Sequence, residues 1–169
     1  MNGYQRLWWQ QAQSDHAVLV LLRQRSAAPC HQLHYLQMVT EKLAKAYIWR
    51  SGNKPPPRSH IGFAAFLRRL GDVGASERQQ IAGVLGFARF KDFQNWIPAV
   101  MPLAHQLENL APTLAQDGPN PEYPWPHTAP KHAPATFKFD VWTQLTGTGR
   151  GRQLIRIIDV AVDKFPAYG

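Results

Sequence analysis

HYLQMVTEKLAKAYIW, residues 34–49, places its apolar side chains three and four positions apart, which is the spacing of an amphipathic helix. Glu41 and Lys45 stand four residues apart in the order that stabilises a helix, by about 0.3 kcal/mol. One apolar stripe runs through the stretch and begins just before it: Leu33, Leu36, Leu43 and Tyr47. We therefore predict a helix from about Cys30 to Arg50.

The neighbouring segments predict further helices. Residues 5–25 repeat apolar side chains at helical spacing, which indicates a first helix. After the second helix, residues 51–60 contain a glycine and three consecutive prolines, which end a helix and extend the chain. Ser59 then suits the N-cap of a short third helix at about 60–70.

Capping residues and prolines predict where the helices in the second half of the chain begin and end. Ser76 and Gln79 have the spacing of a capping box that opens a helix. Pro98 is expected to break the helical stretch 91–115. Thr148 is expected to cap the final helix, which has one apolar face: Leu154, Ile157, Ile158, Ala161 and Phe165.

Residues 116–136 carry six prolines and little periodicity, so we predict a long loop before the final helix. Strand-like alternation is confined to FKFDVW at 137–142, which is too short to define a sheet. The sequence therefore predicts an all-α fold. We expect an up-and-down bundle of four to five main helices that forms a single domain over residues 1–169.

Composition narrows the class of protein. With 169 residues, 44% of them hydrophobic, the chain can bury a core without disulfides or metals. Cys30 is the only cysteine, and Cys30, His31 and His34 lack a fourth ligand, so we expect neither a metal site nor a cofactor. The apolar run 17–22 is too short to cross a bilayer. These features favour a cytoplasmic protein that does not enter a membrane.

The charge is unevenly distributed. The chain carries a net charge of +8, and no acidic residue lies between Lys42 and Leu70. That concentration predicts a basic corner between the second and third helices, with seven residues as candidates for binding RNA or an acidic protein: Lys42, Lys45, Arg50, Lys54, Arg58, Arg68 and Arg69. A solvated basic face without a specific partner is the alternative.

Two acidic residues lie where helices should meet. Asp15 falls on the apolar stripe of the first helix, and Glu41 is in the second helix. A buried carboxylate needs a cationic partner, which Lys42, Lys45 or an arginine could supply. We expect Asp15 and Glu41 to form structural ion pairs rather than to act in catalysis.

Short motifs spread over most of the chain resemble the HEPN family of small helical-bundle proteins. The first helix is similar to the family pattern at Trp8 or Trp9, Ala12 and Asp15. NPEYPW at 120–125 resembles its Tyr-Pro element, although Glu122 replaces the expected arginine. The second helix carries the clearest match: Gln37, Glu41, Lys42, Lys45 and Ala46.

The resemblance implies a HEPN-like module, a homodimer, and a role in toxin–antitoxin or antiviral defence systems. Many family members are metal-independent ribonucleases, while others are non-catalytic partners of nucleotidyltransferases or antitoxins. The family's catalytic arginine–histidine motif is missing from its expected place. Its only literal match, from Arg25 to His31, lies at the turn between the first two helices.

Metal-free RNA cleavage needs a base, an acid and a cation beside the phosphate. His60 and Arg58 are the best local candidates, because they lie in the most basic segment and next to a predicted helix start. His60 could equally cap or pack the third helix. Two hypotheses follow: a HEPN-like module that binds a partner or nucleic acid through the basic corner, or a ribonuclease with His60 and Arg58 at its site.

Overall fold

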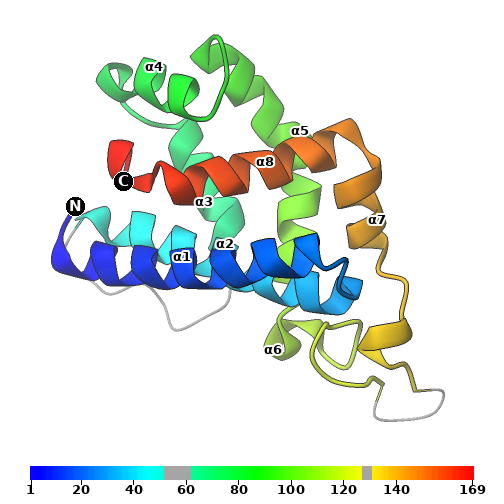
Figure 1. The fold of residues 1–169 in the computed structure, drawn as a ribbon. Helices are drawn as coiled ribbons and strands as arrows, with labels where there is room; N and C mark the ends of the chain where they lie inside the picture. The colour runs from blue at the N-terminus through cyan, green and yellow to red at the C-terminus, as the bar shows by residue number, and fades with distance from the viewer. Residues whose placement is uncertain (52–61, 127–130) are drawn as a thin grey trace.

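The computed structural model describes residues 1–51, 62–126 and 131–169, and the described chain is all-α (Figure 1). It contains eight α-helices and no strand in these ranges; one isolated β-bridge joins Trp125 to His132. The helices are α1 Gly3–Gln24, α2 Pro29–Ile48, α3 Phe63–Gly71, α4 Ala75–Val84, α5 Phe90–Glu108, α6 Pro112–Ala115, α7 Asp140–Gly147 and α8 Gly149–Asp163. The prediction of an all-α bundle is confirmed.

Four helices of fifteen or more residues form the frame: α1, α2, α5 and α8. Helices α1 and α2 pack extensively against each other, and α8 lies beside α1, as Figure 1 shows. Helix α5 runs across the direction of α1 and α8, while α3 packs on both α2 and α5. The two ends of the chain lie close together on one side of the bundle.

The apolar stripes read from the sequence line the core. In α2 the stripe at 33, 36 and 43 is fully buried, and the predicted face of α8 is buried throughout. Large aromatic side chains fill the centre: Phe63, Phe66, Phe93 and Phe165. Burying an aromatic or aliphatic side chain contributes roughly 1.5–3 kcal/mol, so these stripes decide which face of each helix turns inward.

Several predicted boundaries are wrong. Helix α3 begins at Phe63, with Gly62 at its N-cap, and the predicted cap residue, Ser59, lies outside the described residues. Helix α4 begins at Ala75 after Gly74, and neither Ser76 nor another side chain caps it. At the last helix the prediction is confirmed, because Thr148 Oγ1 accepts a hydrogen bond from the backbone N–H of Gly151 at 2.9 Å.

Pro98 does not break α5, which is continuous from Phe90 to Glu108. Pro98 and Pro102 stand four residues apart and both are exposed. The carbonyl groups that lose an N–H partner to these prolines therefore lie toward solvent, where water replaces the bond. The buried face, which includes Val100 and Leu107, keeps the helix against the core.

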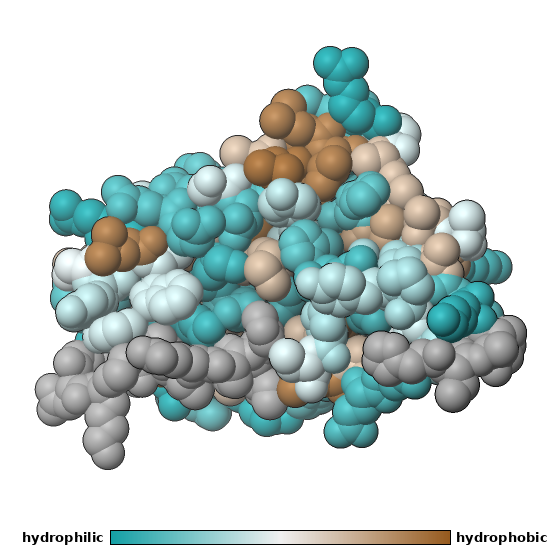
Figure 2. All heavy atoms as spheres, turned by 90° about the horizontal axis from the view of Figure 1, so that it is seen from below, coloured by the Kyte–Doolittle hydropathy of each residue, from teal (hydrophilic) through white to brown (hydrophobic). Residues whose placement is uncertain are grey.

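Seen from below, the surface is mostly hydrophilic, with hydrophobic atoms gathered in a few separate groups (Figure 2). The loop after α6 is held to the bundle by Trp125, whose ring is buried against Phe137 and Phe139. No helix among the described residues has the length and apolar character needed to cross a membrane.

Candidate functional site

Two of the predicted partner-binding lysines lie inside the helix interface instead. Lys42 Nζ is 3.3 Å from Asp15 Oδ2, and Lys45 Nζ donates to Glu41 Oε1. The Lys42 and Lys45 side chains are only 14% and 9% exposed, and Lys45 also lies 4.9 Å from the ring centre of Trp8. They neutralise buried carboxylates between α1 and α2. Their ammonium groups are therefore not available to bind a partner.

The remaining predicted residues separate into two groups. Arg50 is exposed, but it donates to the Tyr47 hydroxyl at 3.1 Å and pairs with Glu77. Arg68 and Arg69 project from the last turn of α3 into solvent. The other three candidates lie outside the described residues: Lys54, Arg58 and His60.

A groove of about 280 Å³ lies between α3 and α5. Its basic side chains are Arg68 and Lys91, and its one acidic side chain is Asp72. Amide groups complete its polar wall, with Gln94 and Asn95 on α5. This α3–α5 groove therefore combines two cations with hydrogen-bonding amides, which is the chemistry that binds phosphate groups.

One histidine stands beside the groove between a cation and a carboxylate. Arg68 Nη2 lies 3.1 Å from His105 Nε2, and His105 Nδ1 lies 3.4 Å from Glu108 Oε2. A guanidinium can only donate, so Nε2 accepts and the proton of the neutral ring is on Nδ1, facing the carboxylate. Glu108 therefore orients the ring through Nδ1, as a carboxylate does for a general base, while Arg68 occupies the lone pair of Nε2.

Glu108 also fixes the start of α3. Its Oε1 accepts the backbone N–H groups of Gly62 at 2.9 Å and Ala64 at 2.8 Å, and the residue is 4% exposed. A carboxylate at this place also interacts favourably with the partial positive charge of the helix N-terminus. The same side chain thus positions both α3, which carries Arg68, and His105.

A second polar cluster joins α1 to α8. Asp159 accepts hydrogen bonds from Arg23 at 2.8 and 3.0 Å and lies 2.8 Å from His16 Nε2. Burial raises the pKa of the Asp159 carboxyl, but the hydrogen bonds from His16 and Arg23 outweigh it, so the pKa lies below its ordinary value. Both oxygens of the carboxylate are engaged, which indicates a structural clamp.

We predict that Asp159→Asn lowers the free energy of unfolding at pH 7 by about 1–2 kcal/mol, because Arg23 and His16 lose a half-buried charge partner. Since the folded-state pKa is below the unfolded one, this contribution is present above about pH 4 and is lost as the pH falls through the folded-state pKa. Urea unfolding of the wild type and of Asp159→Asn at pH 7 and pH 3 measures this contribution. Asp163→Asn, at an exposed pair, should change stability little at either pH; equal losses in both variants would contradict the clamp.

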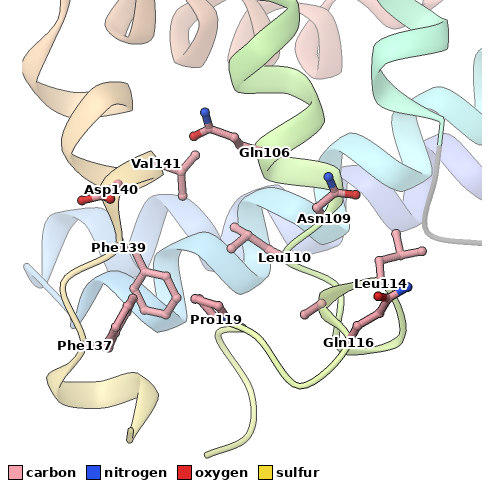
Figure 3. Close-up of a pocket in the computed structure, with 11 residues that line it drawn as sticks. Gln106, Asn109, Leu110, Leu114, Gln116, Pro119, Phe137, Phe139, Asp140 and Val141 are labelled. Atoms are coloured by element: carbon pink, nitrogen blue, oxygen red, sulfur yellow. The ribbon is translucent and has the colours of Figure 1, made fainter. Parts of the chain in front are cut away.

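A pocket of about 510 Å³ lies beside the end of α5 (Figure 3). Leu110, Phe139 and Val141 point toward the same space, and amides stand at its rim, among them Gln106 and Asn109. Asp140 is its only titratable lining residue. The pocket can hold an apolar group, but it offers no acid–base pair for catalysis.

In the described ranges, no three His, Cys, Asp or Glu residues lie close enough to hold a metal ion. Cys30 is buried, and His34 lies 3.3 Å from Glu122, which ties the loop to α2. Comparisons of the chain with protein-family models, curated proteins and solved structures found no match. The geometry of the site therefore carries the functional argument.

Sequence reasoning missed His105, Glu108 and Lys91. Lys91 and His105 are fourteen residues apart on α5, and His105 meets Arg68 only because α3 and α5 pack together. A partial signal existed, since a glutamate three residues after a histidine on a helix places both side chains on one face. Nothing in the sequence indicates that Glu108 reaches the start of another helix.

Proposed function

We propose that this chain is a HEPN-like helical module that binds RNA phosphates on the α3 side of the bundle. The observation that supports it is a group of exposed cations on α3 and α5 that form no ion pair with a described carboxylate: Arg68, Arg69 and Lys91, of which Arg68 and Lys91 line one groove. Most acidic residues of the chain are paired elsewhere with a lysine, an arginine or a histidine. An excess of unpaired cations around a groove attracts a polyanion.

The HEPN part of the proposal is supported by the all-α fold and by the α2 residues that carry the resemblance. Lys54 and Arg58 precede α3 in the sequence and add two positive charges to that segment of the chain. A toxin–antitoxin or defence setting would supply either an RNA target or an acidic protein, such as an antitoxin or a nucleotidyltransferase. We favour RNA because Arg68 and Lys91 adjoin amide groups that can also donate to phosphate oxygens.

Fluorescence anisotropy with labelled single-stranded RNA between 50 and 200 mM salt tests this proposal. We expect Arg68→Ala/Lys91→Ala to weaken binding about tenfold on every RNA sequence. The slope of log affinity against log salt should fall by about 1.4, since each lost phosphate contact on a single strand contributes about 0.7. Arg25→Ala/Lys138→Ala removes the same charge from exposed positions on other elements and is the matched control.

The groove variant and its control distinguish binding in the α3–α5 groove from binding through net charge. Equal weakening by both would show that net charge, rather than the α3–α5 groove, drives binding. If the unmodified protein has no salt-sensitive affinity for RNA, the RNA proposal is wrong and an acidic protein partner replaces it.

A second candidate function, metal-independent RNA cleavage, is favoured by the position of His105. A histidine oriented by a carboxylate can accept or donate a proton near neutral pH, and the neighbouring Arg68 could stabilise charge on the phosphate. His60 and Arg58, the candidates from the sequence, lie outside the described residues and remain candidates on the sequence alone. The activity would need no cofactor.

Mixed RNA incubated with the protein in excess chelator distinguishes cleavage from binding. Cleavage that disappears in His60→Ala or His105→Ala would assign that histidine to the reaction. Cleavage that persists in both variants would locate the activity elsewhere, and an absence of cleavage with intact RNA binding would leave the binding module as the function.

A further inference from the structure

Arg68 takes part in two arrangements at once. Its side chain lines the α3–α5 groove together with Lys91, and its Nη2 lies 3.1 Å from Nε2 of His105. Arg68 is exposed in the last turn of α3, so packing against the core does not fix its guanidinium. The position of this cation over the groove therefore depends on its contact with His105.

The contact requires an uncharged histidine. A guanidinium only donates hydrogen bonds, so Nε2 of His105 can hold it only while that nitrogen carries a lone pair. When the ring is protonated, both of its nitrogens are donors, and two positive charges face each other across the 3.1 Å between Arg68 and His105. Protonation therefore turns the attraction between these two side chains into a repulsion.

Glu108 keeps the histidine ring in place. Its side chain is only 5% exposed, and its Oε1 accepts the backbone N–H groups of Gly62 and Ala64. Its Oε2 lies 3.4 Å from His105 Nδ1 and attracts the protonated ring more strongly than the neutral one. Because Glu108 is fixed and Arg68 is exposed, Arg68 is the side chain that moves when the ring is protonated.

Few charged groups surround His105 in the part of the chain that the structure describes. Arg68 contacts the ring from α3 and Glu108 contacts it from α5, and no other described residue forms an ion pair or a hydrogen bond with it. Histidine is the side-chain type whose charge ordinarily changes between pH 5 and 8, whereas lysine and aspartate, here Lys91 and Asp72 in the groove, ordinarily keep theirs. A change of affinity for phosphate groups within this pH range therefore reports on histidine.

We propose that His105 positions Arg68 for RNA in a pH-dependent way: the neutral ring holds the guanidinium, and the protonated ring releases it to phosphates in the α3–α5 groove. This inference rests on the proposed function, which supplies RNA as the ligand. The released guanidinium can turn to a phosphate and bind it through two parallel hydrogen bonds. By linkage, bound RNA also favours the protonated ring, because it draws Arg68 away from Nε2.

Fluorescence anisotropy with labelled single-stranded RNA at pH 5.5 and pH 8 tests this role. The unmodified protein should bind about tenfold more tightly at pH 5.5, and the slope of log affinity against log salt should steepen by about 0.7, because one more phosphate contact forms. His105→Gln offers an amide oxygen to Arg68 at both pH values, so it should bind at pH 5.5 as the wild type does at pH 8. His31→Gln removes an exposed histidine from α2 and should keep the full change with pH.

Arg68→Ala separates positioning from a direct contact between His105 and RNA. If the ring acts through Arg68, this variant should bind more weakly, and its affinity should change less than about twofold between the two pH values. A change that persists undiminished in Arg68→Ala would overturn the proposal, because protonated His105 would then bind RNA itself. A wild-type affinity that is equal at both pH values would also overturn it, while the RNA proposal would stand.

A measurement without RNA keeps the two proposals apart. In nitrogen-15 NMR spectra of the free protein, the Arg68 guanidinium should rotate slowly at pH 8, where His105 holds it, and freely at pH 5.5. Equal rotation at both pH values would overturn the release of Arg68, whether or not the protein binds RNA. Release of Arg68 in a protein without salt-sensitive affinity for RNA would support the role of His105 and refute RNA as the ligand.

Discussion

Glu108→Ala is expected to lower the free energy of unfolding by about 3–5 kcal/mol, because two buried N–H groups then lose their only shared acceptor. In the folded protein one carboxylate oxygen binds the N–H groups of Gly62 and Ala64, and no side chain within α3 caps that end. The carboxylate is also a charge-assisted acceptor, which is about twice as strong as a neutral one. For a chain of this size the melting temperature should fall by roughly 10 °C.

Two matched variants separate this role from a general loss of negative charge. Glu108→Gln keeps an acceptor oxygen and should lose only about 1–2 kcal/mol. Glu77→Ala removes a carboxylate from an exposed pair with Arg50 and should lose less than about 1 kcal/mol. Chemical denaturation of the three variants, with circular dichroism as the signal, gives the comparison. Equal effects of Glu108→Ala and Glu77→Ala would refute the capping role.

Glu108 also shows where sequence reasoning stops. Periodicity predicted α1, α2 and α8, because a local spacing decides which face is apolar and the core then buries it. The cap of α3 depends on a residue 44 positions away from Ala64, and only the packing of α3 on α5 brings the two together. Local cap signals come from the residues just before a helix, whereas this carboxylate comes from another helix.

Charge was harder to interpret than apolar spacing. Lys42 and Lys45 counted toward both a basic surface and the partners of Asp15 and Glu41, and a linear sequence gives no means of choosing. The packing of α1 on α2 settles this choice. It buries the carboxylates of Asp15 and Glu41, and a buried carboxylate without a cation is strongly unfavourable. Arg50, Arg68 and Arg69 are the predicted cations that remain exposed within the described chain, and Arg50 is paired with Glu77.

The corner where α7 meets α8 leaves no room for a side chain at Gly151. Gly151 is buried in the first turn of α8, and a Cβ added to it would overlap the carbonyl oxygen of Gln144. The same Cβ would stand 2.5 Å from the Cα and 2.6 Å from the carbonyl oxygen of Leu145. These atoms belong to the backbone of α7, so no flexible side chain can move aside.

Gly151→Ala should therefore force α7 and α8 apart and lower the free energy of unfolding by about 3 kcal/mol or more, since the added methyl group overpacks a corner that cannot relax locally. Gly149, two residues earlier in the same turn, has no atom within 4 Å of an added Cβ. Gly149→Ala should be neutral or stabilise by up to about 1 kcal/mol, because alanine loses less conformational entropy in a helix. Urea unfolding of both variants decides the matter: equal stabilities would mean that α7 and α8 do not approach as closely as this corner requires.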